Sequence, residues 1–317
     1  MKTAHRSALH FPLAVLALAA LLPTAGCSGR LQARFMRRGV EKSVTDYFAG
    51  GVWRFDTIAE GVHSYRMGFD RDLIVETAEG LVVVDPFNGA AAARLAAVLA
   101  ARWPGRPVAA LIYSHYHLDH VRGGAALAPR EVIAHRGCAR YWADLDRRDI
   151  LPPTRTVEGD TTLHMGGVEI RLLDVGKSHT DTLLAVHLPR QKVLFAADLA
   201  FVRALPPVGM PDAYRPGFLA ALRRLGAQDF EHYVPSHFDP GTRADFLAGA
   251  QLYFDADRLV KQYAPGGRSL TDDPARFNAA VDSMYAALDA KYGRWHGGAP
   301  MLLFLVQRTF VGEALGF

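Results

Sequence analysis

The first half of the chain alternates short apolar runs with longer helical segments. Most of these runs hold four or five residues rich in Val, Ile and Leu, which is typical of strands. A longer segment rich in Ala and Leu predicts a helix at about 89–101, and a second helix is expected at about 137–147. The predicted strands of this half are 62–66, 73–77, 81–85, 108–112 and 131–134.

The second half repeats this pattern, without an internal repeat of fixed period. Residues 168–175 alternate between apolar and polar, as a half-buried strand does. Two further apolar runs, 183–188 and 192–197, predict a hairpin across the intervening turn. A helix at about 216–226 follows, and from about residue 242 the pattern is helical.

Alternating strands and helices predict an α/β fold. We expect one domain at 51–265, followed by a helical C-terminal extension at 266–317 with breaks at 265–267 and 297–298. Packing, dimerisation and substrate cover are all open roles for that extension. The sequence leaves the oligomeric state open.

The N-terminus has the pattern of an export signal. Lys2 and Arg6 precede an apolar run at 11–22, which is short for a transmembrane helix. Small residues then lead into Cys27. We expect a signal peptide at 1–26 and a tether at 27–50, which predicts an exported, periplasmic protein.

The small residues before Cys27 resemble the lipobox of bacterial lipoproteins. That resemblance implies lipidation of Cys27 and a membrane anchor, and Ser28 after the cysteine implies the outer membrane. The chain departs from the motif at Thr24, where lipoproteins prefer Leu, and at Pro23. Cleavage without lipidation is the alternative.

Net charge argues against a nucleic-acid partner. The formal charge of +4 is accounted for by Lys2, Arg6 and a basic segment at 28–42, so the remaining chain is slightly acidic. Such a basic tether fits an anionic membrane surface. The chain has only two cysteines, Cys27 and Cys138, which predicts no disulfide framework and a buried, unreactive Cys138.

A dense group of histidines follows the predicted strand 108–112. His115, His117, Asp119 and His120 lie within six positions. Imidazole nitrogens and carboxylate oxygens are ligands of Zn²⁺, and costly polar groups beside a buried strand need a reason to be there. The run therefore predicts a metal site, against the alternative of a histidine-rich surface loop.

Three more candidate ligands end predicted strands: His179, Asp198 and His237. Taken singly, they are equally explained as a turn residue, a helix N-cap and a hydrogen-bonded loop histidine. In order, however, a strand-ending Asp85, the H-x-H-x-D-H run, Ser-His-Thr and the two later residues resemble the metallo-β-lactamase superfamily. The resemblance covers about residues 55–265.

That resemblance implies a four-layer αββα sandwich with the site at the shared edge of two sheets. It implies one metal on His115, His117 and His179, and a second on Asp119, His120 and His237. Asp198 would bridge both metals, and Asp85 would orient the loop without binding metal. Two Zn²⁺ per chain are expected, with iron or manganese as alternatives.

The implied chemistry is hydrolysis by a hydroxide that two cations make available at neutral pH. Asp119 would take and return a proton. Tyr116 or Tyr214 could stabilise an oxyanion, and Arg203 on the loop 201–216 could meet an anionic substrate group. Packing tyrosines and a proline-stiffened connector are the alternatives for these positions. The other candidate histidines, His63, His135, His164 and His187, are not expected to bind metal.

We therefore expect a metal-dependent hydrolase of the cell envelope, acting on a small-molecule ester, lactone, thioester or amide. The alternatives are a true β-lactamase, an iron-dependent oxidoreductase similar to persulfide dioxygenases, and a non-catalytic protein that keeps metal for stability.

Overall fold

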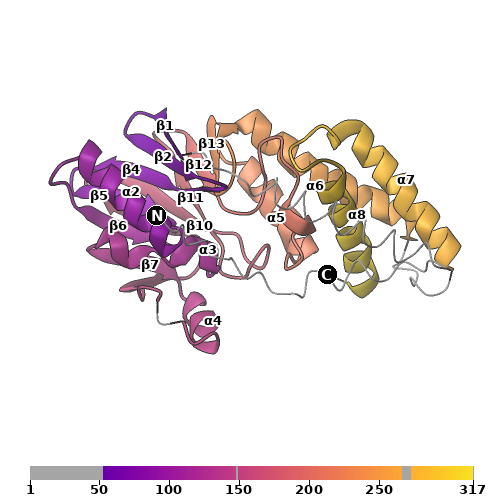
Figure 1. Cartoon of the computed structure of the whole chain (residues 1–317), viewed down its shortest axis with the longest axis horizontal. Helices are drawn as coiled ribbons and strands as arrows, with labels where there is room; N and C mark the ends of the chain where they lie inside the picture. Colours follow the sequence, from indigo (N-terminus) through magenta and orange to yellow (C-terminus); the bar gives the residue numbers. More distant parts are fainter. Residues whose placement is uncertain (1–52, 148, 266–272, 317) are drawn as a thin grey trace, which may run out of the picture. The chain divides into compact units, whose positions relative to one another are not determined.

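The computed structural model describes residues 53–147, 149–265 and 273–316 (Figure 1). The predicted signal peptide, the tether at 27–50 and Cys27 lie outside the described residues. None of the described helices is long and apolar enough to cross a membrane.

Two sheets form the centre of the described part. The first has the strand order β1-β2-β4-β5-β6-β7-β8, with β3 paired to β2. Its strands are β1 (Trp53–Ala59), β2 (Val62–Met67), β3 (Asp70–Arg71), β4 (Leu73–Thr77), β5 (Gly80–Val84), β6 (Val108–Ile112), β7 (Glu131–His135) and β8 (Arg155–Val157). From β5 to β8 the strands are parallel, and from β1 to β5 they are antiparallel.

The second sheet has the order β14-β13-β12-β11-β10-β9. Its strands are β9 (Thr161–Met165), β10 (Val168–Asp174), β11 (Leu184–Leu188), β12 (Val193–Ala196), β13 (His232–Pro235) and β14 (Gly241–Thr242). The predicted hairpin is confirmed as the antiparallel pair β11 and β12. Strands β1, β8 and β9 were not predicted, because their residues lack a long apolar run.

Helices flank both sheets. They are α2 (Gly89–Arg102), α3 (Leu118–Val121), α4 (Cys138–Asp144), α5 (Arg215–Gly226), α6 (Arg243–Tyr263), α7 (Pro274–Tyr292) and α8 (Gly298–Leu315), with short 3-10 turns η3 (Gly124–Leu127) and η4 (Pro207–Gly209). In the view of Figure 1, α5 and α6 lie between the sheets and the pair α7 and α8. The predicted helical C-terminal region is confirmed.

The alternating side chains of β5 face two different hydrophobic cores. Leu81 and Val83 pack in a cluster with Leu95 of α2, on the outer face of the first sheet. Val82 and Val84 belong to a larger cluster, which also holds residues of the second sheet and of α5 to α8. Because both faces of β5 are buried, its run is continuously apolar rather than alternating. The layers are those of the predicted αββα sandwich.

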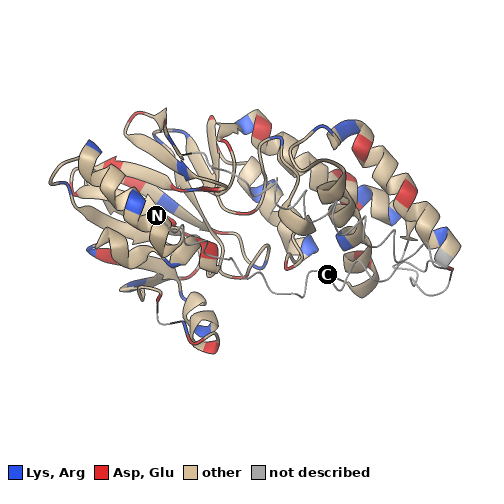
Figure 2. Cartoon of the chain, viewed as in Figure 1, with Lys and Arg blue, Asp and Glu red and all other residues tan. Residues whose placement is uncertain are grey.

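The C-terminal helices share this larger core. Leu302, Val306 and Phe310 of α8 and Met284 of α7 are buried in it. Figure 2 shows basic and acidic residues interspersed along the described ribbon, as on α7. The cysteine prediction holds for Cys138, which is fully buried, and burial raises the pKa of its thiol to about 12.

Candidate metal centre

The histidine run lies where the two sheets meet. The backbone N–H of Leu184, the first residue of β11, donates to the carbonyl of Ser114 at 2.8 Å, so the loop after β6 is tied to the second sheet. The run then enters α3, which carries Asp119 and His120. The apolar strand β6 thus carries the run to the junction of the sheets, as predicted.

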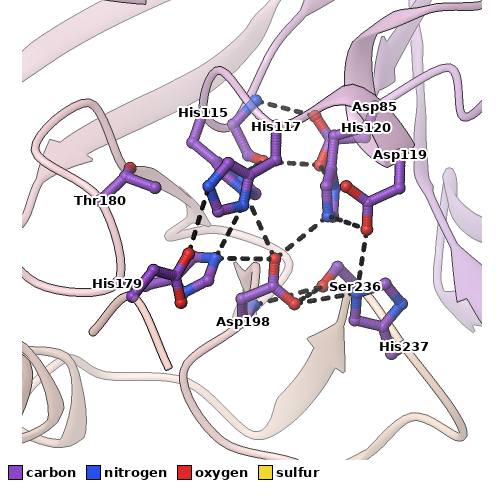
Figure 3. A network of polar contacts seen from close by, with 12 residues as sticks. Asp85, His115, His117, Asp119, His120, His179, Thr180, Asp198, Ser236 and His237 are labelled. Carbon is purple, nitrogen blue, oxygen red and sulfur yellow. Dashed lines mark hydrogen bonds and ion pairs between the residues drawn. The ribbon is translucent and has the colours of Figure 1, made fainter. Parts of the chain in front are cut away.

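Asp85 follows β5 and supports this loop from beneath. Its backbone is left-handed, with φ of 61°, a conformation that Asp tolerates better than most residues. One carboxylate oxygen accepts from the backbone N–H of Ser114 at 2.8 Å. The other accepts from the Ser114 hydroxyl at 2.6 Å and from Nδ1 of His120 at 2.9 Å. Nε2 of His120 is turned towards the other candidate ligands (Figure 3), and it offers a lone pair to a metal when the imidazole is neutral.

We call His115, His117 and His179 the first half-site. Nε2 of His179 lies 3.1 Å from Nδ1 of His117 and 3.4 Å from an oxygen of Asp198. Nε2 of His115 lies 3.4 Å from the same oxygen. Together with Asp198, these residues offer ligand atoms that lie within 4.8 Å of one another.

We call Asp119, His120 and His237 the second half-site. Nε2 of His120 lies 3.5 Å from a carboxylate oxygen of Asp119, and Nε2 of His237 lies 3.9 Å from that oxygen. The ring of His237 stacks on Phe69 with centroids 3.9 Å apart. Both histidines are buried, whereas the Asp119 side chain is 52% exposed.

Asp198 lies between the half-sites. It follows β12 with a left-handed φ of 50°, which turns its carboxylate into the site. Its Oδ2 faces His115, His179 and, at 3.1 Å, His120, while its Oδ1 lies 2.9 Å from Nε2 of His237. The Ser236 hydroxyl donates to Oδ1 at 3.1 Å and fixes the carboxylate (Figure 3).

Burial and opposite charges compete in setting the pKa values of this cluster. Burial lowers the pKa of His115 well below its ordinary value and that of His117 to about 4. Burial would also lower the pKa of His237, but the charges of Asp198 and Asp70 and their contacts with the ring together outweigh it and raise this pKa to about 9. For Asp198 burial acts to raise the pKa, but the neighbouring histidines lower it well below its ordinary value. Asp198 is therefore ionised, whereas His237 has to lose its proton before its nitrogen can bind a cation.

The donor set fits divalent metal ions. Ligands at about 2.0–2.1 Å from a tetrahedral metal lie about 3.3 Å from each other, close to the distances of 3.1–3.4 Å around Asp198 Oδ2 and Nε2 of His179. Nε2 of His115 and Nε2 of His120 are buried without a hydrogen-bond partner among the described residues. An unpaired buried polar atom costs about 1–3 kcal/mol, and a bound cation would remove that cost.

Tyr116 lies beside the first half-site. Its ring meets His117 edge-on, with centroids 4.6 Å apart, and stacks on Tyr141 at 3.8 Å. Burial, together with Tyr141, raises the pKa of Tyr116 to about 12. Its hydroxyl therefore keeps its proton at neutral pH and can donate a hydrogen bond.

The other two predicted substrate residues lie on the segment after Asp198. The backbone N–H of Tyr214 donates to the carbonyl of Ser178 at 2.8 Å, so Tyr214 borders the loop of His179. Lys177 lies over the Tyr214 ring at 4.3 Å. The carbonyl of Arg203 accepts from the backbone N–H of His296 at 2.9 Å, which places Arg203 against the segment before α8.

Sequence reasoning missed two carboxylates that contact candidate ligands. Asp212 lies 3.3 Å from Nε2 of His117 and 3.5 Å from Nδ1 of His179. Asp70 lies 3.2 Å from Nδ1 of His237. Asp212 could have been noticed as an acidic residue within the loop 201–216. Asp70 carries no such signal, because its partner lies far away in the sequence.

The discounted histidines have other partners. Nε2 of His63 lies 2.9 Å from Glu76, and Nε2 of His135 lies 3.3 Å from Asp174. His187 lies on β11, which is buried throughout. Its Nε2 contacts the carbonyl of Asp229 at 2.8 Å. His164 is exposed on β9.

Two curated proteins are similar to this chain in sequence. A curated relative, the 2,4-dinitroanisole O-demethylase subunit alpha of Nocardioides sp. (strain JS1661), is 32% identical over 213 residues, covering 66% of this chain and 62% of that protein. A hydroxyacylglutathione hydrolase of Mesorhizobium japonicum is 30% identical over 153 residues, covering 47% of this chain and 57% of that protein. The chain thus spans about three fifths of the length of these relatives.

Solved structures share the fold. A metallo-beta-lactamase from Pontibacter korlensis superposes with a TM-score of 0.56 at 24% identity, covering 64% of this chain and 99% of that one. A stereoselective inverting sec-alkylsulfatase from Pseudomonas sp. superposes with a TM-score of 0.65 at 17% identity, covering 84% of this chain and 52% of that one. Because it covers 84% of this chain, the match to the alkylsulfatase extends beyond residues 51–265.

The family model of the metallo-beta-lactamase superfamily matches residues 73–237, just over half of the chain. With its two-sheet fold and its ordered histidines and aspartates, the protein belongs to the metallo-β-lactamase superfamily.

Proposed function

We propose that this protein is a dinuclear-metal hydrolase of the cell envelope, acting on a small-molecule ester, lactone, thioester or amide. The observation that carries the proposal is the place of Asp198 between two sets of donors. Its Oδ2 faces the first half-site and its Oδ1 faces His237 of the second. A carboxylate so placed suits two cations that share one ligand.

Zinc is the metal that we propose for both half-sites. Imidazole and carboxylate donors suit Zn²⁺, although iron and manganese accept the same donors. One ion would be held by the first half-site, and the other by the second half-site. Asp198 would contact both ions. When bound, such a pair lowers the pKa of a shared water from about 16 towards 7 and polarises a substrate oxygen.

The chain's own residues would orient the substrate and move protons. Asp119 is half-exposed, so one of its oxygens is available to accept a proton and return it to the leaving group. Burial acts to raise the pKa of Asp119, but the charge of His120, its contact with the carboxylate and the charge of His237 together lower it, which keeps this carboxylate ionised before the reaction. Tyr116 would donate its hydroxyl hydrogen bond to a developing oxyanion.

Sulfate esters and aryl methyl ethers are a second substrate class. The relative at 32% identity is named as an O-demethylase of 2,4-dinitroanisole, and a linear primary-alkylsulfatase of Pseudomonas sp. is 22% identical over 218 residues. β-Lactams are a further candidate, because a metallo-beta-lactamase type 2 of Bacillus cereus is 26% identical over 182 residues. In this proposal, each of the three bond types would be attacked at the same pair of half-sites.

The first experiment is elemental mass spectrometry of the full chain, purified in detergent without chelator. We expect two zinc ions per chain, and an ester or thioester turnover that His117→Ala abolishes. Iron or a single metal would instead favour the oxidoreductase alternative and would direct assays to oxygen consumption. A folded chain without metal would overturn the proposal.

Export and anchoring form a separate part of the proposal. The apolar run 11–22 and the small residues before Cys27 support a lipidated, outer-membrane protein. Cys27→Ser should move the protein from the membrane fraction to the soluble periplasmic fraction. Membrane retention of that variant would contradict the anchor.

A further inference from the structure

Asp212 meets the first half-site from its outer side. His117 Nδ1 and His179 Nε2 lie 3.1 Å apart and face the position proposed for a metal. The opposite ring nitrogens, His117 Nε2 and His179 Nδ1, each lie near a different oxygen of Asp212, at 3.3 Å and 3.5 Å. One carboxylate therefore spans the outer nitrogens of two candidate ligands, which lie 62 positions apart in the sequence.

Short contacts of this kind would select the tautomers that metal binding needs, once the ring N–H groups donate to the carboxylate. A neutral imidazole carries one N–H, and donating it to a carboxylate leaves the other nitrogen's lone pair free for a metal. Asp212 would fix that choice for both rings at once. Its side chain is 41% exposed, so solvent screens its charge and the effect on orientation is the larger one.

Helix α8 holds the backbone on both sides of Asp212. Nε of Arg308 donates to the carbonyl of Pro211 at 3.1 Å, and Nη2 donates to the carbonyl of Ala213 at 2.6 Å. Arg308 is half-buried, and burial lowers the pKa of its guanidinium although the Asp212 charge acts to raise it. Arg308, which is hydrogen-bonded to the residues on either side of Asp212, thus also interacts electrostatically with the Asp212 carboxylate.

The segment before Asp212, residues 208–210, also packs against α8. Val208, Gly209 and Met210 are left-handed, with φ of 49°, 71° and 54°. A side chain at Gly209 would meet the carbonyl of Phe304 at 2.7 Å, because the turn lies against the α8 backbone. Strained backbone of this kind persists only where surrounding contacts hold it.

We propose that Asp212 is a positioning residue for the first half-site, and that the C-terminal helix α8, through Arg308, sets the position of Asp212. The helix is then a support of the metal centre as well as part of the core. This inference rests on the proposed function, in which His117 and His179 bind metal.

The test is a zinc competition titration with a chromophoric chelator on the full chain. Loss of an outer-shell partner commonly weakens metal affinity about 10- to 100-fold, and we expect a loss in this range at one of the two sites for Asp212→Asn. The second zinc should bind as in the unmodified protein. Arg308→Ala should weaken the same site, by less. Asp212→Glu, which keeps a carboxylate, should retain more affinity than Asp212→Asn.

Two control variants and a spectroscopic readout separate positioning from general destabilisation. Asp229→Asn, at an 82% exposed carboxylate, and Arg258→Ala, at a 62% exposed side chain on α6, should leave zinc affinity unchanged. Nitrogen NMR of the histidines should show altered N–H signals for His117 and His179 in Asp212→Asn. An unmodified protein that binds no metal would overturn the proposed function. Normal zinc binding that is unaffected or strengthened by Asp212→Asn would overturn this inference alone.

Discussion

The two half-sites of the candidate metal centre differ in the carboxylates that lie against their outer histidine nitrogens. In the second half-site, Nδ1 of His120 meets Asp85, whose side chain is 1% exposed, and Nδ1 of His237 meets Asp70, which is 21% exposed. Both aspartates lie in or next to strands of the first sheet. In the first half-site, two outer nitrogens meet Asp212, which is 41% exposed and lies on a loop. The position of a buried carboxylate such as Asp85 is fixed by the core around it. The position of Asp212 instead depends on the contacts that hold its loop, which include those of Arg308.

This difference predicts that the second half-site is organised before metal binds. The Asp85 contacts belong to the folded sheet edge and need no ion, and groups of this kind are costly to disrupt. The first half-site has to position a more exposed carboxylate through α8. Four measurements test the contrast, in order of decreasing expected effect.

The largest effect is expected for Asp198→Ala, which removes the carboxylate shared by both half-sites. The zinc content should fall from two ions per chain to less than one, because each half-site loses a donor. Elemental mass spectrometry measures the content. Asp160→Ala, at a 54% exposed carboxylate paired with Arg224, is the matched control and should keep both ions. Two ions retained in Asp198→Ala would rule out the bridging role.

The next effect is expected for Asp85→Asn. The amide oxygen can still accept from the Ser114 backbone N–H, but the amide nitrogen that replaces the other oxygen can accept from neither the Ser114 hydroxyl nor Nδ1 of His120. We expect the free energy of unfolding of the metal-free chain to fall by about 1–3 kcal/mol, measured by urea denaturation. Asp212→Asn should cost less than this in the same assay, since its side chain is exposed. Equal losses would contradict the contrast between a buried and a loop support.

A smaller effect is expected for Asp70→Asn. The variant removes the charge beside His237, and we expect about a tenfold loss of zinc affinity at the second half-site. The chelator titration described above measures it. A loss at the site weakened by Asp212→Asn would show that the two half-sites are not separately supported.

The smallest effect is a local one, produced by metal removal. Hydrogen exchange at residues 207–214 should become faster when zinc is chelated, because Asp212 then loses its ordered partners. The amide of Ser114 should stay protected, because its hydrogen bond to Asp85 needs no metal. Faster exchange at Ser114 alone would reverse the proposed order of rigidity.

Much of the fold could be predicted from the sequence, because the buried strands β5, β6 and β12 carry continuous apolar runs. The seven candidate ligands were found because four of them form a dense run after β6, and because the order and spacing of all seven resemble the superfamily. Strands β1 and β9 were missed, since their residues are partly exposed and carry no strong periodicity. Asp70 and Asp212 were missed for a different reason. Their partners are set by tertiary contacts across the fold, which local pattern does not encode.

The expected substrate residues show the same limit. Tyr116 was chosen for its place in the histidine run, and the structure does put it beside His117. Arg203 was chosen for its charge on a loop, and its described backbone contact is with His296. Charge and proximity in sequence do not fix where a loop side chain lies.

The hydrogen bond between Leu184 and Ser114 joins two stretches of chain that supply different ligands. Four candidate ligands come before residue 158, and His179, Asp198 and His237 come after it. The turn between β8 and β9, with Gly159 at φ of 70°, is therefore a place where the chain could be cut into two fragments. Neither fragment would hold a complete half-site together with Asp198. High-affinity zinc binding would then report the reassembly of the two pieces, which makes the metal a sensor of their association.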